Sequence, residues 1–563
     1  MHTIKITEIF SVLKDRRFFI LIIFLLSSFF YYHQFLQTGH FAGTYFRIFS
    51  IIEFLFSLCV NILFFKYRFF GAALAGILFP RFFQIVTGLE GHSTLFPYFT
   101  GLSFAVLLKA VFDAENSRFR EKYSLKDALN GRSLMILASM LYLSILLLRE
   151  WISNYGFGLL DFPFRDREVS PGVSANLSMH HSLTAALNLF GPLLWIFTEK
   201  IFFLQKESSM QNQIMAGFTA GAAFNICVML IQSFTEPDAF LFRFYKGTAK
   251  SFEVGRLPGF FSDSGSSAAL MPVLFYISYI YIKNNMLKQN IIYSKILSSG
   301  VFLIVLVSAG IYQGRGYFLV SSAVLLILFL HLYYFSFLVL NKNKREMLYA
   351  SVFIFASGMI LLYLIKDFTS MKRILGAFPG IVEAIANYNL YDAFMTLDSE
   401  RTRLFLVGLN IFYDHVLIGS GLNTFVRESS FYRTETMISH DNSANLYIGA
   451  LSDTGIVGTL IVLLMLALYG YFLYLYLEKI RTGEAGGDLL KSFEIFMIPG
   501  IILVSFLFGY HIVHPETAVV FFLPLFCCSF REEGKRLRAG MYFNVLIYFL
   551  IILYVIIYFA MHF

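Results

Sequence analysis

The stretch "TLIVLLMLALYGYF", residues 459–472, carries no charged side chain and follows a polar stretch, "SHDNSANLYIGALSDTGIVG", residues 439–458. Such an apolar run is typical of a helix that crosses a membrane, because a hydrocarbon core of about 30 Å requires about 20 apolar residues. The whole chain has the same character. Of its 563 residues, 57% are hydrophobic and 14% are charged, and the mean hydropathy is +0.68. This composition lies outside the range of soluble proteins and predicts an all-α polytopic membrane protein.

Similar apolar runs recur along the chain and predict about fifteen membrane crossings. They lie at residues 18–36, 45–66, 70–88, 94–113, 133–152, 181–204, 213–233, 266–284, 293–312, 316–339, 347–365, 455–477, 492–512, 516–530 and 541–561. Three regions follow from these positions. Residues 1–365 form an N-terminal bundle of about eleven spans, residues 366–445 form one large loop, and residues 446–563 form about four more spans.

Lysine and arginine gather in every second loop, which predicts that these loops and the N-terminus face the cytoplasm. The basic residues are Lys66, Arg68, Arg118, Arg120, Lys122, Lys126, Arg132, Lys200, Lys206, Lys283, Lys288, Lys342, Lys344, Arg345, Lys479, Arg481, Lys491, Arg531, Lys535, Arg536 and Arg538. The large loop, residues 366–445, then lies on the opposite face. The net charge of +8 comes mainly from the cytoplasmic loops. Anionic membrane lipids account for it, and nucleic acid is not predicted as a partner.

Neither the cysteines nor the histidines predict a metal site. The four cysteines lie in apolar runs without metal-ligand spacing and indicate no disulfide framework: Cys59, Cys227, Cys527 and Cys528. Histidine pairs occur at residues 180–181 and at His511 and His514. Glu516 is close to the second pair, but no carboxylate completes a three-ligand set at helical spacing. The sequence therefore predicts no metal and no cofactor.

Two arginines accompany glycines on the predicted outward face. Arg256 precedes "PGFFSDSG", residues 258–265, where a helix begins, and free backbone N–H groups beside a guanidinium suit an anion. The alternative is that Asp263 and Ser264 cap the helix while Arg256 meets lipid phosphates or water. Arg315 lies between two glycines in the turn "YQGRG", where a ligand can approach the backbone closely. The alternative interpretation of Arg315 is that its side chain extends to the membrane interface without binding a ligand.

The large loop contains a segment whose apolar positions between 404 and 418 fit an amphipathic helix on the membrane surface, ended by "GSG", residues 419–421. Arg401 and Arg403 stand at its predicted start. Arg403 is interpreted as a lipid contact, and the role of Arg401 stays open.

Within the spans, Glu53 and Arg81 fall at similar depths in the second and third predicted crossings, so they can pair. Such a pair locks two helices together or faces a cavity that holds a lipid carrier. The structural interpretation is favoured.

The order of these motifs resembles the O-antigen ligase and polymerase family of bacterial inner-membrane glycosyltransferases. The shared elements, which cover residues 250–475, are Arg256 before a Gly/Phe cluster, Arg315 in "QGRG", Arg401 ahead of Gly419 and Gly421, and His440 with Asn442 ahead of Gly455 and Gly458. Three features depart from the family pattern. "SDSG", residues 262–265, replaces the common Asn/Pro pair. Phe405 stands where the family usually has Trp, and Asp441 separates His440 from Asn442.

The resemblance implies a multi-helix fold like that of membrane (GT-C-like) glycosyltransferases, placed in the bacterial inner (cytoplasmic) membrane with its active site at the periplasmic face. It implies transfer of a glycan from a polyprenyl diphosphate carrier, such as undecaprenyl diphosphate, to an acceptor sugar hydroxyl. A ligase delivers the glycan to a lipid core, as in lipopolysaccharide, whereas a polymerase delivers it to another repeat unit. The implied partners are this donor, a lipid or glycan acceptor, and membrane lipids.

The chemistry of this transfer suggests roles for the motif residues. The departing diphosphate gathers negative charge, and fixed cations such as Arg256 and Arg315 stabilise that charge. The acceptor hydroxyl needs a base that titrates near neutral pH, and His440 fits this requirement. Arg401, Asp441 and Asn442 are predicted to bind substrate.

The helix after His440 adds a second argument. If Asn442 or Ser443 caps this helix, the helix dipole favours neutral His440, and Asp441 or Asp453 can orient its ring. The alternative is an interfacial histidine with no catalytic role.

Two other functional classes fit a chain with many spans. A transporter or flippase of lipid-linked oligosaccharides would place ionisable residues near the middle of the bilayer, whereas this chain gathers its polar motifs on one face. A glycan-binding scaffold would need neither His440 nor Arg315 near a diphosphate.

Overall fold

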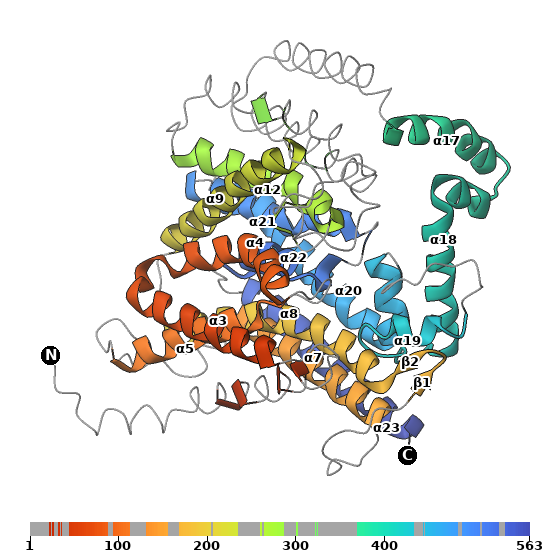
Figure 1. Ribbon diagram of the computed structural model, residues 1–563, viewed down its shortest axis with the longest axis horizontal. Coiled ribbons are helices and arrows are strands. Elements are labelled where there is room, and N and C mark those ends of the chain that lie inside the picture. Colours follow the sequence, from red (N-terminus) through yellow and green to blue (C-terminus); the bar gives the residue numbers. More distant parts are fainter. Residues whose placement is uncertain are drawn as a thin grey trace.

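The computed structural model describes residues 44–87, 94–112, 131–155, 168–203, 207–234, 259–261, 264–285, 369–432, 445–481, 487–506, 511–527 and 535–562, together with isolated positions elsewhere. Helices make up most of this part of the chain (Figure 1). Two short strands, β1 (Glu168–Ser170) and β2 (Val173–Ser174), pair antiparallel. The chain is an all-α polytopic membrane protein, as its composition predicts.

Within the described residues, six helices are long and apolar enough to cross a membrane. They are α7 (Gly131–Tyr155), α8 (Ala175–Phe202), α9 (Glu207–Phe234), α12 (Ser264–Asn285), α20 (Leu446–Arg481) and α23 (Lys535–His562). Each of them coincides with a predicted crossing. The predicted crossings at residues 18–36, 293–312, 316–339 and 347–365 lie mostly outside the described residues.

The second and third predicted crossings differ from the prediction. α3 (Thr44–Leu63) and α4 (Arg68–Thr87) meet at a bend of 105° across the short turn η1 (Phe65–Tyr67). Two consecutive full crossings would run nearly antiparallel, whereas this pair forms a broken span or a re-entrant loop. Hydropathy misses the difference because both arrangements bury the same apolar residues.

Three further helices are shorter: α5 (Phe96–Phe112), α21 (Gly487–Ser505) and α22 (Pro515–Cys527). α22 has 13 residues. At a rise of about 1.5 Å per residue it is about 20 Å long, less than a hydrocarbon core of about 30 Å. Val519 and Leu523 of α22 are fully buried, so this helix packs inside the bundle.

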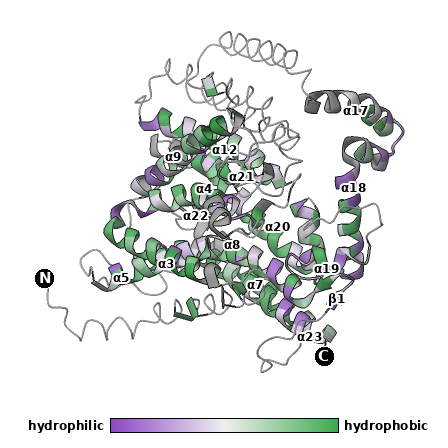
Figure 2. Ribbon diagram, viewed as in Figure 1, coloured by the Kyte–Doolittle hydropathy of each residue, from purple (hydrophilic) through white to green (hydrophobic). Residues whose placement is uncertain are grey.

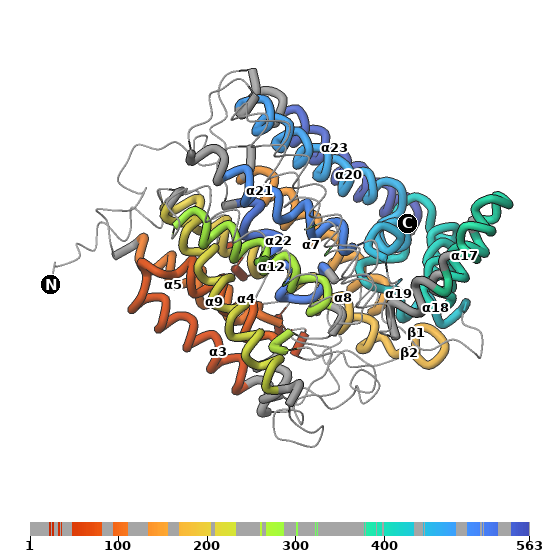
Figure 3. The backbone as a smooth tube through the Cα atoms, turned by 90° about the horizontal axis from the view of Figure 1, so that it is seen from above, coloured from red at the N-terminus to blue at the C-terminus, as the bar shows by residue number. Residues whose placement is uncertain are grey.

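The bundle is built around α8, in which nearly every residue is buried. α8 packs against α5, α7 and α22. α20 and α23 lie side by side along one edge of the bundle (Figure 3). The bundle helices are predominantly hydrophobic over their length (Figure 2). This arrangement fits a core of helix contacts surrounded by lipid.

Two buried ion pairs join helix ends at one end of the bundle. Arg68, at the start of α4, pairs with Glu199, near the end of α8. Lys283, near the end of α12, pairs with Glu494, near the start of α21. These four helix ends are ones that the alternation of basic loops assigns to the same face. Because burying charge is costly, such pairs are better suited to fixing the register of helices than to adding stability.

The segment predicted as a large loop contains three helices: α17 (Thr369–Ala386), α18 (Leu390–Asp414) and the short α19 (Phe425–Ser429). α17 and α18 lie beside the bundle at the right edge of Figure 1. Asn389 caps α18, its side chain accepting a hydrogen bond from the N–H of Asp392 at 3.1 Å. Arg401 and Arg403 therefore lie in the interior of α18, and the prediction that they begin the helix is wrong. The polar residues between Asn389 and Arg401 are helical because the Asn389 cap starts the helix before them.

Glu53 is buried in α3, whereas the side chain of Arg81 lies outside the described residues. The pair between them stays a prediction.

Candidate functional site

The two glycine motifs that the sequence singled out lie against each other. α20 is interrupted at Gly455, and the segment 452–457 around this break runs beside the segment 416–421 that follows α18. Four backbone hydrogen bonds join the segments: Ser420 N to Ser452 O at 2.7 Å, Gly421 N to Asp453 O at 2.8 Å, Ile456 N to Val416 O at 2.8 Å, and Val457 N to Leu417 O at 3.1 Å. We call this contact the glycine junction. It satisfies backbone groups that the break in α20 frees.

Glycine is required on both sides of the junction. Gly419, Gly421 and Gly455 have φ angles of +69°, +126° and +64°, which residues with a side chain rarely adopt. A Cβ atom on Gly419 would lie 2.3 Å from the backbone of Asp453, and one on Gly421 would lie 1.5 Å from Glu150 Oε1. The close approach of these segments thus excludes a side chain.

The segment after the junction is tied to α8 and α20. Ser182 donates to the carbonyl of Leu422 at 2.6 Å, and the side chain of Asn423 donates to the carbonyl of His181 at 3.1 Å. The N–H of Asn423 donates to Asp453 Oδ2 at 2.9 Å. Asp453, predicted as one possible partner of His440, therefore has an oxygen that holds the backbone of this segment.

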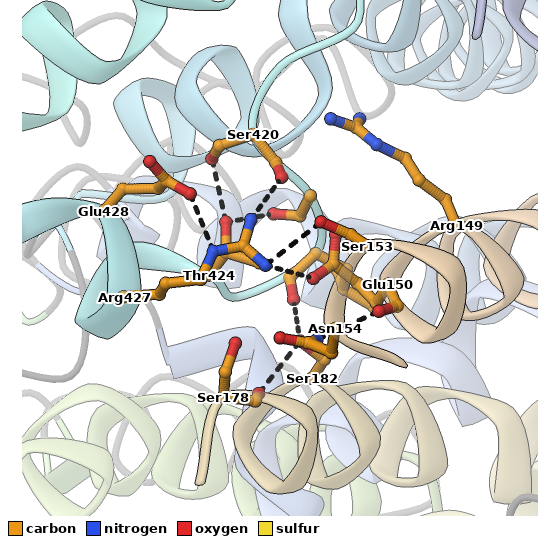
Figure 4. Close-up of polar contacts among 12 residues, drawn as sticks. Arg149, Glu150, Ser153, Asn154, Ser178, Ser182, Ser420, Thr424, Arg427 and Glu428 are labelled. Atoms are coloured by element: carbon orange, nitrogen blue, oxygen red, sulfur yellow. Dashed lines mark hydrogen bonds and ion pairs between the residues drawn. The ribbon is translucent and has the colours of Figure 1, made fainter. Parts of the chain in front are cut away.

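Arg427, on α19, connects this segment to α7 (Figure 4). Its guanidinium donates to Glu150 Oε2 at 3.3 Å, to Ser153 Oγ at 3.5 Å, to the carbonyl of Ser420 at 3.0 Å and to Glu428 Oε1 at 2.7 Å. Glu150 is completely buried and Arg427 is 7% exposed. Burial alone would lower the pKa of Arg427, but the nearby carboxylates of Glu150 and Glu428 raise it above its usual range. Arg427 is therefore permanently charged, and its hydrogen bonds hold its guanidinium in one position.

Arg149 lies one residue before Glu150 and has different partners. It donates to the carbonyls of Ile418 and Gly419 and to the hydroxyl of Tyr554 on α23. Its guanidinium also lies 5.6 Å from the ring centroid of Tyr558. The adjacent Arg149 and Glu150 thus hold α7 against the glycine junction from two sides.

Glu428 and His415 form the more accessible part of this polar cluster. His415 Nε2 lies 3.6 Å from Glu428 Oε2, and the His415 side chain is 40% exposed. Burial tends to raise the pKa of Glu428, but the hydrogen bond of His415 and the charge of Arg427 lower it below its usual range. Glu428 is therefore ionised at neutral pH.

A cavity of about 450 Å³ opens beside this cluster. It is lined by Arg149, Ser153, Glu168, Val169, His415, Ile418, Gly419, Ser420, Arg427, Glu428 and Met561. Its size is that of a pocket for a small organic molecule. Among the described residues, no three His, Cys, Asp or Glu side chains are grouped to hold a metal ion.

Lowering the pH is expected to weaken the fold through Glu428. Because its pKa in the folded protein is depressed, the carboxylate contributes stability that is fully present above the pKa of an unfolded glutamate, about 4.3. This stability is lost as the pH falls through the lower pKa of the folded state. Thermal unfolding of purified wild type and Glu428→Gln should differ at neutral pH by about 1–2 kcal/mol and converge in acid. A difference that is constant between neutral and acid pH would contradict this assignment.

Asn445 caps α20 at the end nearest His440. Its Oδ1 accepts from the N–H groups of Tyr447 at 2.8 Å and Ile448 at 3.1 Å. Ser443 instead donates to the carbonyl of Asn445 at 2.8 Å. The prediction that Asn442 or Ser443 caps this helix is therefore wrong, because α20 begins two or more residues later than the polar run suggested.

Removing this cap is expected to cost about 1 kcal/mol of stability in Asn445→Ala. The measurement is thermal unfolding of the purified protein beside Asn410→Ala, which removes an exposed amide from the interior of α18. The control variant should be unchanged or slightly stabilised, since alanine favours a helix. Equal melting temperatures for wild type and Asn445→Ala would show that the cap does not limit stability.

Most residues predicted to form the catalytic site fall outside the described part of the chain. These are Arg256, Arg315, His440, Asp441 and Asn442. Arg401 is described and is half-buried in α18, but it does not line the cavity. The described structure thus brings together the glycine motifs and leaves the charged motif residues as predictions.

Sequence reasoning missed Arg149, Glu150, His415, Arg427 and Glu428. A signal existed for the first two. An adjacent arginine and glutamate end the predicted crossing at residues 133–152 on the face opposite the basic loops, where the positive-inside rule gives no reason for an arginine. The same reasoning selected Arg315. The other three lie in a polar stretch in which no single residue stands out.

Comparison with known families agrees with this geometry. Residues 300–463 match the family model described as O-antigen ligase. This segment of the chain is similar to the O-antigen ligase family. A search of curated proteins finds no match. The family supports a role in glycosyl transfer during polysaccharide assembly.

The O-antigen ligase match contains both sides of the glycine junction, as well as His415, Arg427 and Glu428. Arg149 and Glu150 lie outside it, on α7. The candidate site therefore combines the O-antigen ligase segment with a helix from the N-terminal bundle.

Proposed function

We propose that this protein transfers a glycan from a polyprenyl diphosphate carrier to an acceptor sugar hydroxyl at the periplasmic face of a bacterial inner membrane, as an O-antigen ligase or a polysaccharide polymerase. The observation that carries the proposal is the O-antigen ligase match over residues 300–463. The glycine junction supports it, because the motifs that suggested this family from the sequence pack together.

In the proposed reaction, His440 accepts the proton of the acceptor hydroxyl as its oxygen attacks the anomeric carbon of the donor sugar. The bond from this carbon to the diphosphate oxygen breaks, and the bonding electrons stay on that oxygen. The polyprenyl diphosphate is thus the leaving group. Arg256 and Arg315 stabilise the charge that develops there. Arg401, Asp441 and Asn442 bind the substrates. No metal is required in this scheme, since arginines carry the diphosphate.

The anchoring of α20 supports a catalytic role near its start. Ser443 is buried and bonded to Asn445, the cap of α20. Ser443 is three positions along the chain from residue 440, a separation of at most about 11 Å at full extension. A base at position 440 is therefore linked by a short stretch of chain to a buried, hydrogen-bonded residue just before α20.

The test is the glycan pattern of a strain that lacks the gene, with and without a wild-type copy. A ligase predicts long glycan stranded on its carrier and lipid core without glycan. A polymerase predicts cores that carry single repeats. Surface and carrier-linked glycans that are unchanged by the deletion would contradict glycan transfer and favour a transporter or a scaffold.

A further inference from the structure

The cavity beside Arg427 is balanced in charge. Two arginines, Arg149 and Arg427, and two glutamates, Glu168 and Glu428, line it. Glu150, behind Arg427, adds a further negative charge within hydrogen-bond distance. A phosphate or diphosphate in this cavity would approach the ionised Glu428 and be repelled. The cavity therefore suits an uncharged ligand better than an anion.

The polar groups of the cavity include both hydrogen-bond donors and acceptors. A guanidinium has five N–H donors. Arg427 uses four of these in hydrogen bonds to Glu150, Ser153, Ser420 and Glu428, and the fifth N–H has no partner among the described residues. Each carboxylate oxygen of Glu428 accepts more than one hydrogen bond. A sugar hydroxyl both donates and accepts, so it can donate to Glu428 while accepting from Arg427.

These polar groups are held in place before a ligand binds. Arg427 is more than nine-tenths buried and is fixed by α7 on one side and by the carbonyl of Ser420 on the other. Glu428 is held by Arg427, and His415 lies beside it. Ile418 and Met561 add apolar surface to the lining of the cavity, which suits the C–H face of a pyranose ring. Preorganised groups of this kind reduce the entropy lost on binding.

We propose that this cavity binds one uncharged pyranose unit of the glycan or of its acceptor, with Arg427 and Glu428 as the hydrogen-bonding residues and His415 beside them. The class of ligand rests on the proposed function, whereas the existence of the site rests on the cavity. The cavity is a subsite for positioning a sugar, and the transfer itself is assigned to the motif residues.

The test is saturation-transfer NMR on the full-length protein in lipid nanodiscs. The probes are the neutral sugars methyl glucoside, methyl galactoside, N-acetylglucosamine and rhamnose, with inorganic phosphate as the competitor. At least one neutral sugar should bind, and Glu428→Gln should weaken it about tenfold, the loss of a charge-assisted hydrogen bond. His415→Ala should weaken the same sugar, and phosphate should not displace it. Glu383→Gln, the same change at an exposed position of α17, is the matched control and should bind as wild type does.

The proposal is overturned if no sugar in the set binds in a way that depends on Glu428 or His415, or if inorganic phosphate displaces the sugar. If Glu428→Gln fails to fold, His415→Ala decides, because the His415 side chain is part-exposed and its one described side-chain contact is with Glu428. The experiments distinguish a failure of the proposed sugar site from a failure of the proposed function. Sugar binding with unchanged glycans in the deletion strain would remove only the proposed function, and normal transfer with no sugar binding would remove only this site.

Discussion

Replacing His440 with alanine is expected to lower glycan transfer by about 100- to 10,000-fold, the usual contribution of a general base. The loss should appear in turnover, since the base acts on the hydroxyl as it attacks. The measurement is transfer by the purified protein from a polyprenyl-diphosphate-linked donor. Membrane insertion and thermal stability should stay close to those of the wild type.

His33→Ala is the matched control, since His33 is exposed and far in sequence from the motifs. His415→Ala gives a second comparison. It is expected to raise the KM for the donor or for the acceptor, whichever supplies the bound sugar, with little change in kcat, because His415 is assigned to sugar binding. If His440→Ala keeps full turnover while His415→Ala loses it, the base is His415, which already lies 3.6 Å from a carboxylate.

Replacing Arg427 with methionine is expected to cost about 3–5 kcal/mol of stability. The change leaves the carboxylate of Glu150 completely buried without its ion-pair partner, 3.3 Å away in the wild type. It also removes the bonds to Ser153 and to the carbonyl of Ser420. Reversible unfolding of the purified protein in mixed detergent measures the difference.

The double variant Arg427→Met with Glu150→Gln is expected to recover part of this loss, since no unpaired charge is then buried. Arg403→Met, an exposed arginine of α18, is the matched control and should change stability by no more than about 0.5 kcal/mol. Additive losses in the double variant would show that the two charges do not interact.

The helices that the structure describes were largely predictable, because apolar runs determine them. The runs at residues 133–152 and 541–561 became α7 and α23. Hydropathy could not predict the bend between α3 and α4, or the short length of α22, since a buried helix and a spanning helix have the same composition. It also could not predict that α18 starts as early as Leu390, where polar residues are helical because Asn389 caps them.

The glycines of the candidate site were predictable from the sequence, whereas most of its charged residues were not. Gly419, Gly421 and Gly455 were identified as motif residues, and their positive φ angles explain why glycine stands there. That the two motifs meet is a tertiary fact that spacing does not reveal. The contact of Arg427 with Glu150 joins residues 277 positions apart, and no local pattern marks Arg427 as its partner.

The glycine junction closes a loop. Residues 422–451 run between two segments that are hydrogen-bonded to each other, so both ends of this stretch are fixed at one place. Closing a loop of about 30 residues has a cost in conformational entropy, and this cost rises only slowly with loop length. The protein meets this cost when it folds. The two ends of this stretch are therefore held together before any substrate arrives. A donor or acceptor that binds there has less chain to order, much as a cross-link lowers the entropic cost of assembling a binding surface.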